Sequence, residues 1–274
     1  MDGVKNDFLR VAAAQLNSTG DLQANLEKVF KYIIQAKEAG AQFISFPENS
    51  LIFYDPDHPK NVSFGSDDNP IREIVALAKK LEIAVHIGSF PERIPDTEKV
   101  YNTSAIIHPD GRLGALYRKI HLFNFRLSES QQICESDRVQ GGRVPVIDAL
   151  GPWNYGLSIC YDLRFPELYR VLSQKKAHIL LIPSAFTSVT GPSHWEVLLR
   201  ARSIENQCYV IAAAQWGKHN ASRESFGHTM IIDPWGGIIS QLSESEGLIY
   251  ADLDFKEIER VRQKLPALAD RKLS

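Results

Sequence analysis

The sequence of 274 residues predicts one α/β domain over residues 1–274, built on two sheets with helices outside. Three observations indicate this fold class. Strand-like and helix-like segments alternate from end to end, no Ser/Gly-rich linker or change of composition divides the chain, and no short repeat is visible. One polar, irregular segment from Phe123 to Gly142 is too long for a passive connection, so we expect a functional loop there.

The chain opens with a β–α–β pattern. Leu9 to Leu16 is apolar and rich in small residues, which is typical of a buried strand. Apolar residues then recur at helical spacing, with Asp21 as the expected N-cap and Gly40 as the expected C-terminal stop. A short apolar strand from Gln42 to Phe46 follows and is ended by a proline.

The same alternation continues to the middle of the chain. The pattern predicts a helix from Ile71 to Leu81 and a strand from Ile83 to Gly88. We expect Val100 to His108 and Arg112 to Arg118 to be strands joined by Pro109-Asp110-Gly111, because proline and glycine favour the backbone angles of a turn.

The second half of the chain repeats this pattern. Expected strands lie at residues 144–150, 155–159, 177–182, 208–214, 227–233, 237–242 and 248–253, and expected helices begin near Pro166 and extend over 193–205 and 255–264. The two strands that flank Pro234-Trp235-Gly236 are expected to form a hairpin.

Composition and charge exclude two classes of protein. The chain carries 31 basic and 33 acidic residues, a net charge of −2, and shows no basic stripe, so we expect no nucleic-acid partner. Its first residues are polar, and no stretch approaches the ~18 apolar residues that span a bilayer. We therefore expect neither a signal peptide nor a membrane partner.

The three cysteines, Cys134, Cys160 and Cys208, are odd in number, and no CxxC pair exists. The sequence therefore predicts neither a disulfide framework nor a Cys-rich zinc site, and a reducing, cytoplasmic compartment is the default expectation. The eight histidines show no ligand spacing, so no metal site is expected. Whether one thiol performs chemistry stays open at this point.

The common catalytic motifs are absent, but one segment is close to a known turn. Gly156-Leu157-Ser158-Ile159-Cys160 is similar to the nucleophile turn of serine hydrolases, with a cysteine where the second glycine is usual. This difference shifts attention from Ser158 to Cys160.

Glu48, Lys119 and Cys160 each stand at the carboxyl end of an expected buried strand. Such ends line the ligand crevice of open α/β sheets, so a carboxylate, an ammonium and a thiol can converge there. This set suits acyl transfer. A cation lowers the thiol pKa from ~8.5 and favours the thiolate, the carboxylate moves the proton, and the ammonium stabilises an oxyanion. Taken singly, each residue also has a structural explanation, as a small buried hydrophobe, a helix cap or a solvated lysine.

Three segments add a second line of argument: residues 46–49 (FPEN), 117–123 (YRKIHLF) and 159–168 (ICYDLRFPEL). In sequence, order and approximate spacing they resemble the three signature blocks of the nitrilase superfamily, the carbon–nitrogen hydrolases. The opening strand and Trp235-Gly236 also match, so the resemblance covers essentially the whole chain.

The resemblance implies a four-layer α-β-β-α sandwich (nitrilase-like), with Glu48 as general base, Lys119 as oxyanion stabiliser and Cys160 as nucleophile. The family has a second active-site glutamate in the loop after the lysine block, and Glu135 is the matching position. A solvated loop carboxylate is the alternative explanation for Glu135. The other two thiols are expected to be bystanders. The resemblance also implies no metal and no cofactor, and pairing through helices near the nucleophile into a homodimer or larger homo-oligomer.

The branch within the superfamily is indicated by residues 183–187, 190–196 and 199–215, which are similar to the group of deaminated-glutathione amidases and ω-amidases. The resemblance implies a cysteine-dependent amidase that hydrolyses a primary amide of a small carboxylate-bearing substrate, deaminated glutathione first, to acid and ammonia through a thioester. The alternatives are an ω-amidase acting on 2-oxoglutaramate or 2-oxosuccinamate, a nitrilase or carbamoylase, an acyltransferase, and a non-catalytic binding protein. The intact catalytic set argues against the last.

Five residues are candidates for substrate binding. Arg164 is a candidate for holding the substrate carboxylate, with an ion pair to the carboxylate three residues further on as the alternative. Phe186 and Thr187 follow a strand end and are expected pocket walls. Tyr161 is expected to offer its backbone N–H to the oxyanion, and Tyr54 to line the entrance.

Overall fold

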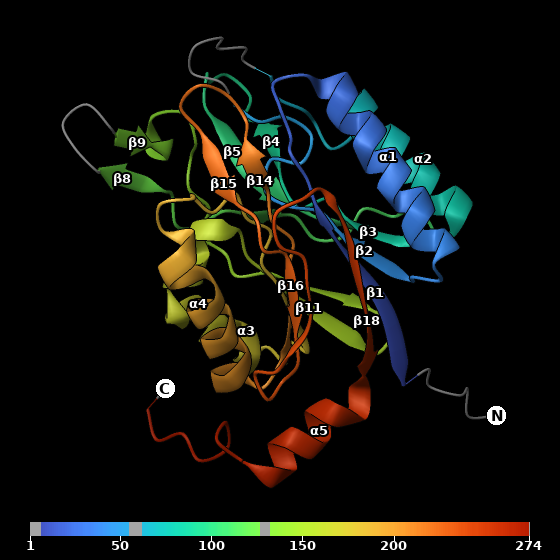
Figure 1. Cartoon of the computed structure of the whole chain (residues 1–274), viewed down its shortest axis with the longest axis vertical. Coiled ribbons are helices and arrows are strands. Elements are labelled where there is room, and N and C mark those ends of the chain that lie inside the picture. Colours follow the sequence, from blue (N-terminus) through green and yellow to red (C-terminus); the bar gives the residue numbers. More distant parts are fainter. Residues whose placement is uncertain (1–6, 55–61, 127–131, 274) are drawn as a thin grey trace.

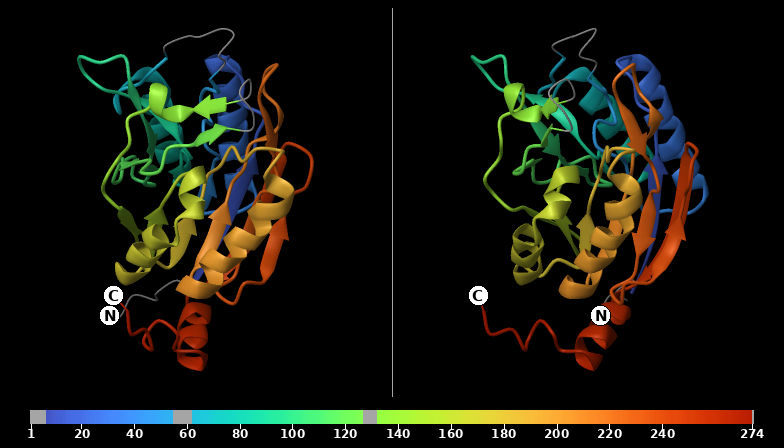
Figure 2. Two further views of the ribbon diagram at one scale, coloured as in Figure 1. Left: turned by 90° about the vertical axis from the view of Figure 1, so that its left-hand side faces the viewer. Right: turned by 60° about the vertical axis from the view of Figure 1, so that its left-hand side comes forward.

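The computed structural model describes residues 7–54, 62–126 and 132–273. Two β-sheets pack face to face, and a pair of helices covers the outer face of each sheet (Figure 1, Figure 2). This arrangement is the four-layer α-β-β-α sandwich that the resemblance implied. The central strands are buried on both faces, which explains their nearly continuous apolar sequences.

The first sheet has five strands in the order β18-β1-β2-β3-β6. Their bounds, in this order, are Gly247–Asp254, Phe8–Gln15, Phe43–Ser45, Ala84–His86 and Ile106–Ile107. β1, β2 and β3 are parallel and are connected by α1 (Leu22–Glu38) and α2 (Asn69–Leu81), whereas the two edge strands are antiparallel. Asp21 caps α1 as expected, because its carboxylate accepts a hydrogen bond from the Ala24 N–H.

The second sheet has six strands in the order β10-β11-β12-β13-β16-β17. Their bounds are Ile147–Leu150, Trp153–Leu157, Ile179–Leu181, Tyr209–Ala212, Met230–Ile232 and Ile238–Gln241. The parallel strands β11, β12 and β13 are connected by α3 (Pro166–Gln174) and α4 (Gly191–Asn206). Each sheet therefore contains the same β–α–β–α–β unit, flanked by antiparallel strands.

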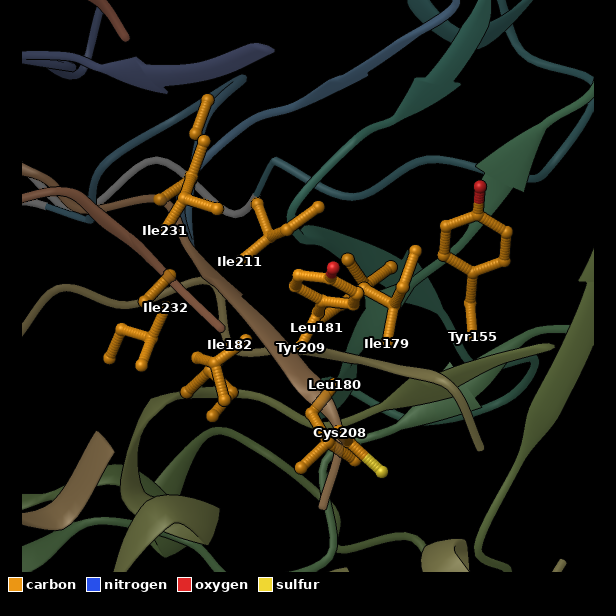
Figure 3. Close-up of a cluster of buried hydrophobic side chains, with 14 of the residues drawn as sticks. Tyr155, Ile179, Leu180, Leu181, Ile182, Cys208, Tyr209, Ile211, Ile231 and Ile232 are labelled. Atoms are coloured by element: carbon orange, nitrogen blue, oxygen red, sulfur yellow. The ribbon is translucent and has the colours of Figure 1, made fainter. Parts of the chain in front are cut away.

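Alternate residues of β1 face opposite layers. Val11 and Ala13 belong to the core that includes the second sheet, whereas Ala12 and Ala14 belong to the core beneath α1 and α2. Figure 3 shows side chains of β11, β12, β13 and β16 within the former core. A slip of one residue would exchange the two faces of β1, so burial on both sides fixes its register.

The expected single strand from Val100 to His108 is wrong, because the chain divides it at Ala105. The first part pairs into a small three-stranded sheet, and the second part is β6 of the first main sheet. The small sheet contains β4 (Phe90–Arg93), β5 (Val100–Ser104) and β7 (Tyr117–Arg118). The pairing of β5 with β7 places Asn102 beside Lys119, whose N–H donates to the Asn102 carbonyl at 2.9 Å.

Two short hairpins escape the sequence pattern, since strands of three residues show too little alternation to be recognised. They are β8 (Asn124–Arg126) with β9 (Gln132–Cys134), and β14 (Trp216–Lys218) with β15 (Glu224–Phe226). The first lies in the expected functional loop, of which residues 127–131 fall outside the described ranges. The last helix, α5 (Phe255–Lys264), has the expected bounds. Among the described helices, none combines the length and the apolar character that a membrane crossing requires.

A buried histidine of the first sheet lies between two serines. His86 Nδ1 is 2.8 Å from Ser45 Oγ, and His86 Nε2 is 2.7 Å from Ser104 Oγ. Complete burial lowers the pKa of His86 from its ordinary value of 6.5 to about 3. The unfolded chain regains the ordinary pKa, so the contribution of neutral His86 to stability is present above pH 6.5 and is lost as the pH falls toward 3.

We expect His86→Gln to flatten the acid limb of the stability curve, because glutamine bonds to serines but takes up no proton on unfolding. Between about pH 6 and pH 4, the wild-type protein is expected to lose roughly 2 kcal/mol more free energy of unfolding than the variant. Urea unfolding at a series of pH values measures this difference. His194→Gln, at an exposed site, is the matched control. Parallel curves for wild type and His86→Gln would contradict the prediction.

Candidate active site

The four predicted catalytic residues line one cavity, where separate segments of the chain meet. Glu48 follows β2, Lys119 follows β7, Glu135 begins the 3-10 helix η1 (Glu135–Asp137), and Cys160 begins the 3-10 helix η2 (Cys160–Arg164). The cavity has a volume of about 180 Å³, which admits a small organic molecule rather than a folded protein. Because all four residues follow strands whose ends meet at this cavity, their side chains come together there.

Lys119 is the buried centre of this site, with 1% of its surface exposed. Its Nζ lies 2.8 Å from Glu48 Oε1, 2.9 Å from Glu135 Oε2 and 3.1 Å from Glu135 Oε1. Burial by itself lowers the pKa of a lysine, but the charges of Glu135 and Glu48 outweigh it and hold the pKa of Lys119 well above its ordinary value. Lys119 is therefore a permanent cation between two carboxylates.

Glu48 is held through both of its carboxylate oxygens. Oε1 accepts hydrogen bonds from Lys119 Nζ and, at 3.0 Å, from Asn102 Nδ2, and Oε2 accepts one from the Ala185 N–H at 2.9 Å. The same carboxylate is close enough to the Cys160 thiol to raise the pKa of that thiol. Its fixed position beside the thiol suits proton exchange between these two groups.

Glu135 joins the loop to the lysine. Besides Lys119, its carboxylate accepts hydrogen bonds from the Phe123 N–H at 2.6 Å and from Asn102 Nδ2 at 3.3 Å. Both of its oxygens are thus engaged with groups other than the thiol. The carboxylate is 15% exposed, so it is a partner of Lys119 rather than a solvated loop residue.

Cys160 stands at a sharp turn between β11 and η2. Its φ of +48° places a residue other than glycine in the left-handed region, where such residues are uncommon and strained. The Cys160 N–H donates to the Pro183 carbonyl at 2.9 Å, and the Ile159 N–H donates to Asp162 Oδ2 at 2.9 Å. These bonds hold the strained turn, whose geometry agrees with the nucleophile turn suggested by the sequence.

Asp162 also ties this turn to the segment that carries Lys119. The carboxylate is completely buried and accepts a hydrogen bond from the Tyr117 hydroxyl at 2.6 Å. Its Oδ1 accepts another from the His121 N–H at 3.0 Å and lies 2.7 Å from His121 Nδ1. Because Tyr117 and His121 flank Lys119 in the chain, Asp162 fixes the lysine segment relative to the cysteine.

The expected lowering of the Cys160 pKa is wrong. Burial raises the pKa of this thiol well above its ordinary value, the Glu48 carboxylate raises it further, and Lys119 opposes both effects. The positive charge of Lys119 is already balanced by two carboxylates, which explains why it does not prevail. The raised pKa favours the neutral thiol as the resting form of Cys160.

Two of the five expected substrate-binding residues, Tyr54 and Thr187, line the cavity. The side chain of Tyr161 is not part of the lining and packs edge-to-face against Phe123, with the ring centroids 5.1 Å apart. The backbone N–H of Tyr161 lies in the first turn of η2, where N–H groups have no partner within the helix.

Arg164 and Phe186 lie outside the cavity lining, contrary to expectation. Arg164 Nη1 donates to His194 Nδ1 at 3.2 Å, and the guanidinium lies 5.0 Å from the centre of the Phe186 ring. Phe186 is buried against Trp195, with 5.1 Å between the ring centroids. No ion pair within the described ranges joins Arg164 to Glu167. The contacts of Arg164 therefore fit neither of its two expected roles, binding of the substrate carboxylate or an ion pair with Glu167.

The polar residues of the cavity that were not candidates in the sequence include Asn102, Arg138 and Arg223. Asn102 donates to both active-site glutamates, and its Oδ1 is buried with no hydrogen-bond partner among the described residues. Asn102 lies inside an expected strand, and the two arginines lie in irregular segments where no periodicity marks an inward direction. Of the three residues, only Arg138 had a signal in the sequence, because it lies three residues after Glu135 in the expected functional loop.

The two other cysteines differ in their surroundings. Cys208 is completely buried, and its Sγ lies 3.1 Å from the carbonyl oxygens of Ala177 and Asn206, either of which can accept its single proton. Burial raises the pKa of Cys208 to about 11. Cys134 is exposed and lines the cavity next to Glu135. Within the described ranges, no group of three or more His, Cys, Asp or Glu side chains is arranged to hold a metal ion.

Comparison with known proteins agrees with this geometry. The model of the carbon-nitrogen hydrolase family matches residues 10–263. Deaminated glutathione amidase of Homo sapiens is 39% identical over 269 residues, which are 96% of this chain and 82% of the human protein. Deaminated glutathione amidase of Synechocystis sp. (strain PCC 6803 / GT-S) is 39% identical over 263 residues, 95% of this chain and 97% of that protein.

A solved structure shows the same fold. Saccharomyces cerevisiae Nit3, described as a member of branch 10 of the nitrilase superfamily, has a TM-score of 0.87 at 33% identity and is covered over 97% of both chains. The resemblance found in the sequence and the four-layer sandwich are thereby confirmed.

We expect alkylation of Cys160 by iodoacetamide to follow a pKa above that of an ordinary cysteine, so that labelling is slow at neutral pH. Glu48→Gln removes a charge that raises this pKa and retains Lys119, so labelling at neutral pH is expected to accelerate although hydrolysis is lost. Mass mapping of peptides separates Cys160 from the exposed Cys134. Glu27→Gln, on the exposed face of α1, is the control. A wild-type pKa below the ordinary value, or unchanged labelling of Glu48→Gln, would disprove this assignment.

Proposed function

We propose that this chain, which belongs to the carbon–nitrogen hydrolase family, hydrolyses an amide of a small carboxylate-bearing substrate through a thioester on Cys160. One observation carries the proposal: Glu48 and Lys119 are in contact at 2.8 Å in the cavity that the Cys160 thiol lines. A nucleophile, a proton carrier and a fixed cation within one small cavity support acyl transfer.

In the first step, Cys160 Sγ bonds to the carbonyl carbon while the thiol proton moves to Glu48. Glu48 suits this role better than Glu135 because its charge acts on the thiol and raises the thiol pKa, whereas Glu135 is engaged with Lys119 and the loop. The ammonium of Lys119 and the backbone N–H of Tyr161 stabilise the oxyanion. A neutral resting thiol suits this step, because proton loss and attack occur together.

In the second step, Glu48 passes the proton to the amide nitrogen, the C–N bond breaks and a thioester remains on Cys160. A primary amide, as in the ω-amides of 2-oxo acids, releases ammonia. The amide of deaminated glutathione is N-substituted and releases an amine, so the expectation of a primary amide and ammonia is wrong for this substrate. Water then attacks the thioester with Glu48 as base, the C–S bond breaks, and the acid and the thiol form. Side chains and water carry every step, so the proposal includes no metal or cofactor.

Glu135 acts in this proposal as a positioning residue for Lys119. Its two contacts with the ammonium and its bond to the Phe123 N–H support this role. Loss of the Glu135 charge would leave a buried cation with one carboxylate in place of two, which weakens both the position and the protonation of Lys119.

Deaminated glutathione is the first candidate substrate, supported by the names of relatives that are 39% identical over almost the whole chain. The ω-amides 2-oxoglutaramate and 2-oxosuccinamate are the alternative. Nitriles would pass through a thioimidate on the same cysteine, so the site by itself favours no bond type and the substrate has to be measured.

A homodimer or larger homo-oligomer is part of the proposal. Exposed apolar side chains lie on α4 and on the turn between β16 and β17, among them Val197, Ile204 and Trp235. Arg200 Nε donates to the Gly236 carbonyl at 2.9 Å and joins the helix to this turn. Such an apolar face supports pairing of two copies. The three free cysteines support a reducing, cytoplasmic compartment as the proposed location.

We expect Cys160→Ala to lower ammonia release from the ω-amide of a 2-oxo acid by at least about 1,000-fold, because the thioester cannot form. An enzyme-coupled ammonia assay measures the rate. Cys208→Ala removes a buried thiol far from the cavity and is expected to retain activity, which controls for general damage. Full activity of Cys160→Ala would refute the mechanism.

The same preparation tests the substrate class. Initial rates are compared for deaminated glutathione, 2-oxoglutaramate and a simple nitrile, with formation of the acid followed in each case. We expect an amide to be fastest and deaminated glutathione to lead. A faster nitrile would refute the amidase proposal.

A further inference from the structure

We propose that Arg138 and Arg223 form a carboxylate-binding site on the wall of the catalytic cavity, and that this site selects amides with a carboxylate remote from the scissile bond. The inference rests on the proposed function, because it concerns the same cavity. It adds the group that binds the substrate anion, a role that the sequence had suggested for Arg164.

The two arginines come from segments far apart in the chain and line one cavity. The Arg138 guanidinium carbon lies 3.1 Å from the centre of the Tyr54 ring. Arg223, just before β15, lines the same cavity as Tyr54, Glu48 and Glu135. Both side chains line the same cavity as the Cys160 thiol.

The charge balance of the cavity leaves these arginines available to a ligand. Glu48 and Glu135 are both in contact with Lys119. Neither arginine has a carboxylate within 4.0 Å among the described residues, although each is half-buried. Removing a cation from water without an anion is costly, so a carboxylate entering the cavity replaces the lost solvation.

The shape of the guanidinium group favours carboxylates over other anions of similar size. Its N–H groups form a planar fork that matches the two oxygens of a carboxylate, and two such forks can share one carboxylate or hold two. Phe53 and Ile52 also line the cavity and offer apolar contact to the carbon chain between the amide and the carboxylate.

Binding to the Cys160→Ala protein tests the inference without catalysis. Succinamate and butanamide differ only in a carboxylate in place of a methyl group, and glutaramate and pentanamide are the next longer pair. We expect calorimetry to show tighter binding of the acid in at least one pair. Arg138→Gln and Arg223→Gln are each expected to reduce this preference roughly 10- to 100-fold, the value of a charged hydrogen bond.

Matched variants separate this site from general effects of charge. Arg143→Gln, at an exposed position outside the cavity, is expected to keep the wild-type preference. Arg138→Lys and Arg223→Lys retain the charge but lose the fork, so an intermediate preference is expected. If a glutamine variant is unstable, the lysine variants and the wild-type protein at rising salt carry the test, since screening reduces the preference.

Turnover of the same pairs by the protein with Cys160 intact distinguishes the two proposals. Preferred binding of the acids with no hydrolysis of any amide would overturn the proposed function and leave the carboxylate site. Equal binding within both pairs, or a preference that only Arg164→Gln abolishes, would overturn the carboxylate site and leave the amidase mechanism.

Discussion

The buried ammonium of Lys119 is the group on which the site depends. A cation with 1% exposure is tolerated only with close anions, and here Glu48 and Glu135 supply them from two separate segments. Breaking such a buried pair typically costs about 3–5 kcal/mol, so the lysine holds the two carboxylates in place as firmly as they hold the lysine. One ion triad thereby joins the carboxyl end of β2, the end of β7 and the loop that contains η1.

Asp162 extends this constraint to the backbone of the nucleophile. The strained left-handed φ of Cys160 persists because neighbouring N–H groups are bonded to Asp162 and Pro183, and Asp162 also binds residues on both sides of Lys119. The ion triad and the turn are therefore one connected structure. A shift of the lysine segment would therefore also move the thiol. This coupling holds the segments that carry the four catalytic residues in a fixed relative geometry, which catalysis requires.

Long elements could be predicted within a few residues, because amphipathic periodicity and buried apolar runs are properties of the sequence. The expected strand ends then predicted where the catalytic residues lie. The break at Ala105 could not be predicted, because it depends on which sheet each half of the strand joins and no local sequence signal marks it. The expectation of a low pKa for Cys160 considered only the nearby cation. Burial of the thiol and the pairing of Lys119 with two carboxylates arise from the tertiary structure, so the sequence does not show them. Arg138 and Arg223 were not predicted, because only the tertiary structure brings them to the cavity. Arg164 was predicted from its position next to the nucleophile segment, but its contact is with His194 outside the cavity lining.

The charges of the cavity connect the neutral thiol to an anionic substrate. In the described part of the cavity, the cations Lys119, Arg138 and Arg223 face two carboxylates, Glu48 and Glu135. A substrate with one carboxylate, such as 2-oxoglutaramate, makes this set neutral, whereas deaminated glutathione carries a second carboxylate. In the proposed first step the proton leaves the thiol for Glu48 and negative charge appears on the oxyanion, so the total is unchanged and charge moves only from one neighbour of the lysine to another. A resting thiolate would make the occupied cavity negative and would repel the substrate anion. The raised thiol pKa and the two arginines therefore favour the same outcome: a site that admits an anion first and forms its nucleophile afterwards.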